Sequence, residues 1–565
     1  MHDDNKTHCA HRPLRLPMSL LALGLLPVMT AMAAGKLSGD LQSLSPSASV
    51  DVIVQFTTPP SAADLSKVAQ QGGRLKVKFR QIPAAAFTVS ATALKGIAAD
   101  ARVKYISRDR KLAGALEFAE PTVGANIAFQ YGWDGSGVGV AVIDSGIASD
   151  HPDLKPRVVY AESFVPDDSS TDDLYGHGTH VSGIVGGNGS ASSGPSFVYT
   201  FRGIAPKANL INLRVLDSHG QGTDSAVIAA LDRAIELKAT YGIRVVNLSL
   251  GRNVYESYTL DPLCQAVERA WQSGLVVVVA AGNSGRDNSM GTQGYSTIAS
   301  PGNDPYVITV GAMKDMSTAA RGDDLIASYS SKGPTLLDQV VKPDLVAPGN
   351  GIVSALASNG AIRQLYPDNV VPVSYYKSGN VPNASSSYFR LSGTSMAAPM
   401  VSGAAALLLQ QGSLTPDQVK ARLMKTAGKN FPATSVYVDP ATGTNYWSTY
   451  DLFTVGAGYL DVWAALNSTE LAGGPALSPE VVYNASTGTT SLVTLPGSIW
   501  QDAVVWGTAV VWGTNVIVSG NAVVWGTAVV WGTNTTTGFA VVWGTAVVWG
   551  TNQAFPEAVA VRGDR

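Results

Sequence analysis

Cysteine, charge and long apolar runs are all scarce in this chain. Only two of its 565 residues are cysteines, and 14% are charged. The 39 basic residues are balanced by 42 acidic ones, giving a net charge of −3, so no basic surface is expected for nucleic acid. Beyond the N-terminal segment, no uninterrupted apolar stretch is long enough to span a membrane. The length still allows several domains and a large core.

The first 33 residues have the pattern of a secretory signal peptide. A cationic stretch ending at Arg15 precedes an apolar run from Leu16 to Met29, and Ala31-Met32-Ala33 follows as a small-residue cleavage site. Cleavage there would remove Cys9, so no intramolecular disulfide can form despite export. We expect a secreted or cell-surface-associated product without a transmembrane segment.

The remaining cysteine, Cys264, lies in a segment with helical apolar spacing at Leu263, Val267 and Trp271. Because free cysteine is often buried and the sequence implies no catalytic partner for it, we predict a small core side chain.

Three short blocks contain the parts of a nucleophilic relay. Asp144-Ser145-Gly146 comes first, His177-Gly178-Thr179-His180 second, and the block from Gly393 to Pro399 contains Ser395. A serine hydroxyl hardly ionises near neutral pH, so it needs a base within about 2.6–3.2 Å during attack. His177 can be that base, and Asp144 can fix the imidazole tautomer and stabilise the imidazolium.

The surroundings of these residues agree with such a site. Asp144 ends the apolar run Val138 to Ile143, which predicts a buried parallel strand whose carboxyl end is where open α/β sheets place their sites. Strong helix formers follow Ser395, so the nucleophile should lie at a helix N-terminus, where negative charge is favoured. Asn283 follows a second apolar strand in a glycine-rich turn and can donate an amide N–H to an oxyanion.

Two other interpretations fit less well. His177 and His180 lack the i,i+4 spacing and intervening glutamate of a helical zinc pair, so His180 is predicted as a packed neighbour. The glycine series Gly135 to Gly139 precedes its strand, whereas a dinucleotide-binding loop must follow one.

The three blocks, in this order, resemble the motifs of the subtilisin-like serine proteases. Four further blocks resemble that family: Arg202 to Pro206, Tyr329 to Pro334, Lys342 to Gly349 and Phe453 to Tyr459. The resemblance implies an α/β fold with a mostly parallel sheet and helices on both faces over residues 118–466, as the alternation of apolar strands and helices also predicts. It implies a serine endopeptidase with Asp144, His177, Ser395 and Asn283 in the site and no cofactor in the chemistry.

Residues 34–117 are predicted as a separate α+β unit. Strands near 50–56, 74–79, 86–90 and 103–107 and helices near 62–71 and 91–98 give a βαββαβ pattern. This pattern resembles the inhibitor-type propeptide of the family, which implies an intramolecular inhibitor removed by self-cleavage between Ala113 and Thr122. A compact ferredoxin-like domain without an inhibitory role is the alternative.

The partner expected in the cleft is a peptide or protein substrate, bound as an added strand. The resemblance assigns three segments to substrate binding: Gly220-Gln221-Gly222, Ser249-Leu250-Gly251 and Ala280-Ala281-Gly282. Their small apolar walls predict a large uncharged residue before the scissile bond, unless Arg252 changes the pocket.

A structural calcium ion is left open. Asp153 matches a ligand position of the family, but the loop from Asn188 to Thr200 departs from the usual ligand loop. One carboxylate does not make a calcium site of six to eight oxygens.

The C-terminal part is repetitive. After a linker at 467–499, residues 500–552 contain six copies of Ala-Val-Val-Trp-Gly-Thr. Gly-Thr suits a two-residue hairpin turn, so a meander of short strands or a continuous stack is expected. The tail is either a self-packing β module or an exposed tryptophan surface that grips a polymer, an envelope or another copy. A surface or adhesion protein with an auxiliary protease domain is therefore the alternative function.

Overall fold

The computed structural model describes residues 36–493 apart from short gaps at 39–40, 42–43, 46–47, 110, 115–121, 317, 319–320, 379–385 and 485–488. It also describes 510–511, 529–530 and 563–564. The predicted signal peptide lies outside the described residues, as does most of the repeat tail. None of the helices in the described part has the length and apolarity needed to cross a membrane.

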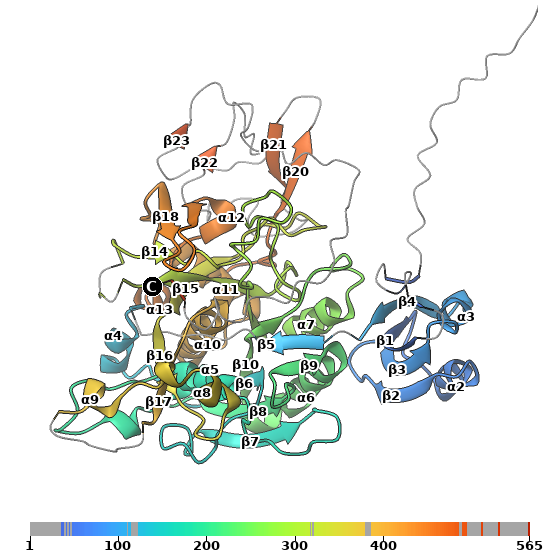
Figure 1. The fold of residues 1–565 in the computed structure, drawn as a ribbon, viewed down its shortest axis with the longest axis horizontal. Coiled ribbons are helices and arrows are strands. Elements are labelled where there is room, and N and C mark those ends of the chain that lie inside the picture. The colour runs from blue at the N-terminus through green and yellow to red at the C-terminus, as the bar shows by residue number, and fades with distance from the viewer. Residues whose placement is uncertain are drawn as a thin grey trace, which may run out of the picture.

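An eight-stranded sheet forms the centre of the larger unit (Figure 1). Its order is β14-β13-β12-β10-β6-β8-β7, and β15 also pairs with β13. The strands are β6 (Gly139–Asp144), β7 (Val158–Ser163), β8 (Asn209–Arg214), β10 (Ile243–Leu248), β12 (Val276–Ala280), β13 (Ile308–Lys314), β14 (Leu325–Ile326) and β15 (Leu345–Asn350). All pairs are parallel except β13 with β14.

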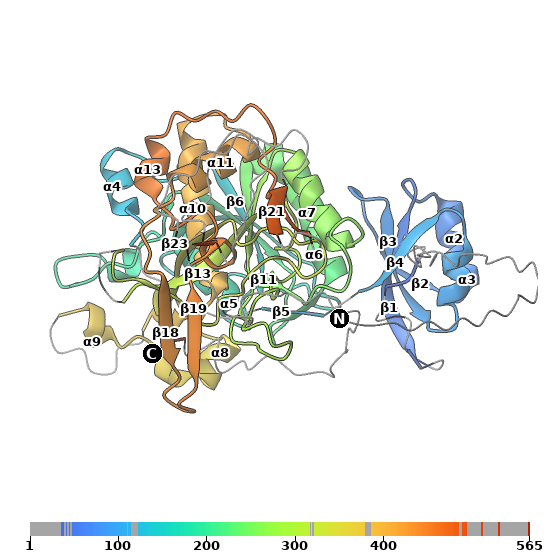
Figure 2. The same cartoon turned by 90° about the horizontal axis from the view of Figure 1, so that it is seen from above.

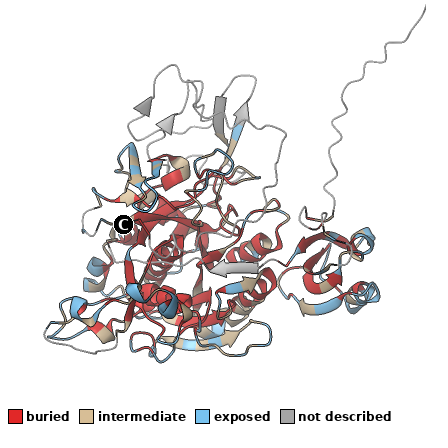
Figure 3. Ribbon diagram, viewed as in Figure 1, coloured by how far each residue is buried: buried red, intermediate tan, exposed pale blue. Residues whose placement is uncertain are grey.

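The sequence forms this sheet because its inner strands are apolar on both faces. Every residue of β6, β12 and β15 is buried, as Figure 3 shows for the centre of the molecule, and a parallel strand covered on both faces needs such a run. Two helix pairs pack against the sheet (Figure 2). One pair is α5 (His177–Gly186) with α10 (Thr394–Gln411), and the other is α6 (Asp224–Tyr241) with α7 (Pro262–Gln272). The predicted α/β class is confirmed.

Shorter elements surround this core. The helices are α4 (Ala125–Gln130), α8 (Ala361–Leu365), α9 (Val373–Tyr376), α11 (Pro416–Thr426), α12 (Leu452–Val455) and α13 (Val462–Leu466). The strands are β9 (Gln221–Thr223), β11 (Leu250–Gly251), β16 (Ile352–Ala355), β17 (Tyr388–Leu391), β18 (Thr434–Val438) and β19 (Asn445–Thr449). Two 3-10 turns cover Ser190–Ser192 and Pro367–Asn369.

The N-terminal unit has its own sheet and its own core. The strands β1 (Ser49–Phe56), β2 (Arg74–Lys78), β3 (Ala84–Ser90) and β4 (Val103–Arg108) pair in the order β2-β3-β1-β4. The helices α2 (Ala62–Gln70) and α3 (Leu94–Ala99) complete the βαββαβ order read from the sequence. A separate buried cluster holds this unit together.

One expectation about the chain after the catalytic domain needs correction. The segment expected to begin a linker at 467 packs onto the larger unit instead. Ser478 is fully buried, donates to Asp344 Oδ1 at 2.6 Å and accepts from Lys420 Nζ at 2.9 Å. The hairpin of β20 (Glu480–Asn484) and β21 (Thr489–Val493) follows. The packed fold therefore extends past Leu466.

Little of the repeat tail is described. The short strands β22 (Val510–Val511) and β23 (Val529–Val530) form a parallel pair. A tight hairpin joins antiparallel strands, so these two copies are not joined by one. The turns predicted between adjacent copies lie outside the described residues.

Candidate active site

The acid and the base of the predicted relay lie together in the interior. Asp144 is the last residue of β6, and His177 is the first residue of α5. The two side chains are at most 1% exposed, and His177 Nδ1 lies 2.7 Å from Asp144 Oδ1. The hydrogen bond from Nδ1–H to the carboxylate leaves Nε2 as the proton-accepting atom of the neutral ring.

Asp173, which was not predicted from the sequence, joins the loop after β6 to the start of α5. Its buried carboxylate accepts from Ser145 Oγ at 2.8 Å, from Gly176 N at 2.6 Å and from Thr179 N at 2.7 Å. Burial raises the pKa of Asp173 despite these bonds. A carboxylate at the start of a helix is favoured by the unpaired N–H groups there, and its position four residues before the histidine could have signalled this role.

The approach of α5 to the Asp144 loop also requires a glycine. Gly178 lies so close to this loop that a Cβ there would be 2.2 Å from Gly146 O. A larger residue would push the helix start, and His177 with it, away from Asp144.

Ser395 is the second residue of α10, the helix that packs against α5. Its hydroxyl is buried and donates to Ser249 O at 3.1 Å. The hydroxyl therefore bonds to a carbonyl oxygen and not to His177 Nε2. Within the described part of the chain, His177 Nε2 is buried and has no hydrogen-bond partner.

Asn283 presents a donor to the same region. Its Oδ1 accepts from Thr394 N at 3.0 Å and from Thr394 Oγ1 at 3.2 Å. These donors fix the amide so that Nδ2 points away from Thr394, and among the described residues Nδ2 has no partner. A buried, unpaired N–H costs free energy unless a ligand accepts from it, which suits an oxyanion-binding role.

His180 does not compete as a base. It is buried, and its Nε2 lies 3.2 Å from Phe389 O. Burial and the nearby His177 lower the pKa of His180 to about 3, so the ring stays neutral. It is a packed neighbour, as expected from its spacing.

Two of the predicted substrate segments flank a strand from the N-terminal unit. The strand β5 (Lys111–Gly114) pairs antiparallel with β9 on one side and with β11 on the other. Ala113 lies opposite Gln221 and Gly251, and Gly114 lies opposite Leu250. The backbone of residues 111–114 therefore occupies the position in which an extended peptide would add a strand.

The pocket segment Ala280-Ala281-Gly282 ends β12 beside these strands. Ala280 and Ala281 are buried, and Gly282 N donates to Thr394 Oγ1 at 3.0 Å. The segment therefore contacts Thr394, the residue before Ser395.

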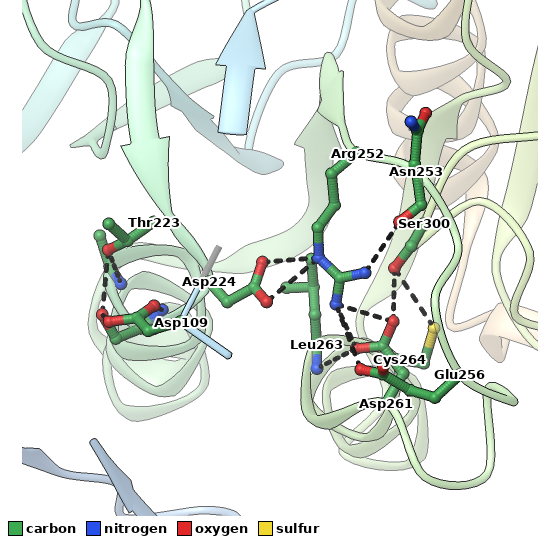
Figure 4. Close-up of polar contacts among 12 residues, drawn as sticks. Asp109, Thr223, Asp224, Arg252, Asn253, Glu256, Asp261, Leu263, Cys264 and Ser300 are labelled. Atoms are coloured by element: carbon green, nitrogen blue, oxygen red, sulfur yellow. Dashed lines mark hydrogen bonds and ion pairs between the residues drawn. The ribbon is translucent and has the colours of Figure 1, made fainter. Parts of the chain in front are cut away.

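Arg252, which follows β11, lies in a buried ionic cluster (Figure 4). Its guanidinium pairs with Asp224 at 2.9 Å and with Asp261 at 2.8 Å, and Glu256 lies 3.9 Å away. Burial alone would lower the pKa of Arg252, but the three carboxylates outweigh it and hold that pKa well above its ordinary value. The cluster ties β11 to the first turns of α6 and α7.

Cys264 lies at the edge of this cluster and is fully buried (Figure 4). Burial, together with the carboxylates of Asp261 and Asp304, raises the pKa of the Cys264 thiol well above its ordinary value. A thiol held protonated is a poor nucleophile, in agreement with a packing role.

Asp153 does not fit a calcium ligand. Its Oδ1 accepts from Ala191 N at 2.7 Å, and its Oδ2 accepts from Tyr388 OH at 2.7 Å. Both oxygens thus face hydrogen-bond donors rather than further oxygen ligands. In the described ranges, no three His, Cys, Asp or Glu side chains lie close enough to hold a metal ion.

The fold and this arrangement define a class, a serine hydrolase built on a parallel α/β sheet. Residues 135–458 match the model of the Subtilase family. The chain therefore belongs to that family and is a serine endopeptidase. Its relatives are serine proteases, which favours the enzyme over the adhesion alternative.

Two relatives come from Bacillus subtilis strain 168. The serine protease AprX is 37% identical over 398 residues, which cover 69% of this chain and 80% of AprX. Subtilisin E is 33% identical over 408 residues, which cover 71% of this chain and 88% of the relative. Among solved structures, the chain is similar to fervidolysin from Fervidobacterium pennivorans, a keratinolytic enzyme related to subtilisin. The TM-score is 0.57 at 22% identity, covering 80% of this chain and 66% of fervidolysin.

Replacing Arg252 tests the ionic cluster. Arg252→Met leaves Asp224 and Asp261 buried without a cation, so we expect a loss of about 3–5 kcal/mol in the free energy of unfolding. The measurement is denaturant unfolding in a Ser395→Ala background, which prevents self-digestion. The control is Arg363→Met, on the exposed face of α8, which should change stability by less than about 0.5 kcal/mol. Equal effects of the two changes would show that the ion pairs of Arg252 do not stabilise the fold.

Proposed function

We propose that Ser395, His177, Asp144 and Asn283 form the catalytic site of an exported endopeptidase that matures by removing residues 34–117. The observation that carries the proposal is the buried hydrogen bond between His177 Nδ1 and Asp144 Oδ1, beside which we place Asn283 and its partner Thr394, the residue before Ser395. Three of their buried polar atoms, Asp144 Oδ2, His177 Nε2 and Asn283 Nδ2, have no hydrogen-bond partner among the described residues. Buried polar atoms without partners are uncommon in proteins, and a ligand that pairs with them is one explanation.

Peptide-bond hydrolysis would proceed through an acyl-enzyme. The Ser395 hydroxyl turns from Ser249 O to His177 Nε2 and gives up its proton there as Oγ attacks the carbonyl carbon. The carbonyl π electrons move to the oxygen, which then accepts from Asn283 Nδ2. Collapse breaks the C–N bond, and His177 returns the proton to the leaving amine. A water molecule repeats the sequence to release the acid and restore Ser395.

Asp144 and the start of α10 would stabilise the charges that form. The Asp144 carboxylate stabilises the imidazolium of His177 without taking its proton. As the second residue of α10, Ser395 has one of the N–H groups that a helix start leaves without an intrahelical partner. The positive end of the helix therefore favours the oxyanion.

The N-terminal unit would act as an intramolecular inhibitor. Its strand β5 lies between β9 and β11, and Asp109 accepts from Ser225 N at 2.9 Å at the start of α6. Arg80 N donates to Asp232 Oδ2 at 2.8 Å on the same helix. These contacts support the proposal that the N-terminal unit blocks the cleft until the chain is cut between Ala113 and Thr122. The signal sequence at 1–33 supports export.

The substrate would be a protein or peptide bound as an extended strand, with a large uncharged residue before the scissile bond. The small walls at Ala280 and Ala281 support this choice, since they leave room for a bulky side chain. The cluster around Arg252 removes the only charge expected near that pocket.

Removal of the nucleophile tests maturation and hydrolysis together. Ser395→Ala should lower casein hydrolysis by about 10⁶-fold and leave a precursor that retains residues 34–117. Mass spectrometry of the wild-type product should find a mature N-terminus between Ala115 and Thr122. The exposed Ser358→Ala serves as the control and should mature normally; normal processing of Ser395→Ala would contradict self-cleavage.

Acid should inactivate the enzyme through a single histidine. His177 accepts a proton only when neutral, so kcat/KM should fall as pH drops, by tenfold per pH unit in the acid limb. A second histidine should not contribute, because the pKa of His180 is about 3. Initial rates with a short chromogenic peptide from about pH 5 to 9 measure the profile. A flat profile, or a slope of two, would be inconsistent with this assignment.

The amide replacement of the acid tests its role separately from its size. Asp144→Asn keeps the shape of the side chain but favours the wrong tautomer of His177, so kcat should fall by about 10⁴-fold. The exposed Asp150→Asn should retain full activity. Circular dichroism checks that both variants are folded, and an active Asp144→Asn enzyme would remove Asp144 from the mechanism.

A further inference from the structure

A dipeptide close to the end of the chain lies buried against the larger unit. Asp564 is 5% exposed although it follows the long repeat tail. Its Oδ1 accepts from Arg286 Nη2 at 2.6 Å and from Ser328 Oγ at 2.7 Å, and its Oδ2 accepts from Ser328 N at 2.7 Å. Three donors thus converge on one carboxylate, one of them a guanidinium. Charge-assisted bonds of this kind are roughly twice as strong as neutral ones.

The guanidinium is held ready for this carboxylate. Arg286 is 11% exposed in its side chain and donates from Nε to Ser328 Oγ at 2.6 Å. Its guanidinium carbon lies 4.7 Å from the ring centre of Tyr437 in β18 and 4.9 Å from that of Tyr446 in β19. Stacking on aromatic faces restricts an arginine to one orientation. The Arg286 side chain is therefore already ordered before the Asp564 carboxylate binds.

The site also contacts the backbone of the dipeptide. Asn350, the last residue of β15, accepts from Asp564 N at 2.8 Å and donates from Nδ2 to Asp564 O at 3.1 Å. This pair of bonds contacts the N–H and the C=O of one residue, as a neighbouring strand would. The carboxylate contacts select the side chain, and Asn350 fixes the backbone that presents it.

The residue before the aspartate must be glycine. Gly563 has φ +63°, and a Cβ there would lie 2.0 Å from Ser392 Oγ and 2.5 Å from Asn350 Oδ1. Both atoms belong to buried residues. Any side chain at this position would therefore collide with the wall of the site as well as strain the backbone.

We propose that Arg286, Ser328, Asn350 and Ser392 form an intramolecular receptor for Gly563-Asp564, which fastens the far end of the repeat tail to the catalytic domain. The ligand class is a peptide segment with a glycine followed by an aspartate. The receptor shares no residue with the substrate strands β9 and β11, so it is a second peptide-binding site. The tail is then held at both ends, after β21 and at Asp564.

The receptor is built on the segments that carry the candidate site. Arg286 lies three residues after Asn283, and Ser392 lies three residues before Ser395. Gly393 N donates to Gly349 O at 2.7 Å, next to Asn350. Docking of the tail therefore braces these segments from outside the cleft.

Hydrogen exchange of the full-length Ser395→Ala protein tests the proposal without any contribution from catalysis. Loss of the carboxylate in Asp564→Ala should speed exchange of the Ser328 amide at least about tenfold, because its acceptor is gone. Gly563→Ala should give the same increase by steric exclusion. Asp368→Ala, which removes an exposed carboxylate from the same unit, is the matched control. Exchange at Ser328 that is unchanged in both tail variants would overturn the receptor.

The same measurement distinguishes the chain's own tail from that of a second copy. Protection of Ser328 in the Ser395→Ala protein should be independent of protein concentration between about 1 and 50 μM if the contact is intramolecular. Protection that appears only at the higher concentrations would assign the occupant to another molecule and overturn the intramolecular proposal.

Discussion

The hydrogen bond between Asp144 and His177 sets the constraint on which the rest of this structure depends. It joins a strand end to a helix start inside a dry interior, where an unpaired carboxylate would be costly. Asp173 is needed because α5 must start within reach of β6, and Gly178 is needed because the helix passes the Asp144 loop without room for a Cβ. The apolar sheet keeps both elements fixed.

The sequence was sufficient for the parts of the molecule that local patterns determine. A parallel strand covered on both faces must be a short apolar run, so the run Val138 to Ile143 predicted β6 to within one residue of its bounds. The βαββαβ order of the N-terminal unit was predicted in the same way, since its strands and helices follow from local patterns. Asp144, His177, Ser395 and Asn283 stay predictions, made from the chemistry of their blocks and from the resemblance of these blocks to the family's motifs.

Contacts between distant segments could not be predicted in this way. The direction of the Arg252 side chain depends on Asp224 and Asp261, whose positions only the folded chain brings together. Ser478 packs beside Asp344 because two buried lysines leave that carboxylate room for another donor, a fact invisible in a polar segment after Leu466. The docking of Asp564 spans more than two hundred residues. Local patterns predict which secondary structure a segment forms, but not which distant charged group it will contact in the folded chain.

The start of α6 connects the N-terminal unit to the substrate strand. Asp224, its first residue, holds Arg252 next to β11, and Ser225 donates its N–H and hydroxyl to Asp109. The start of α6 therefore carries one carboxylate of its own, Asp224, and binds a second one, Asp109, from the N-terminal unit. Release of the N-terminal unit, as proposed above, would expose the N–H of Ser225 to water, which can satisfy it at little cost. The buried pair of Asp224 and Arg252 has no such substitute. The contact of Ser225 with Asp109 is therefore replaceable by water, whereas the buried pairing of Asp224 with Arg252 beside β11 is not.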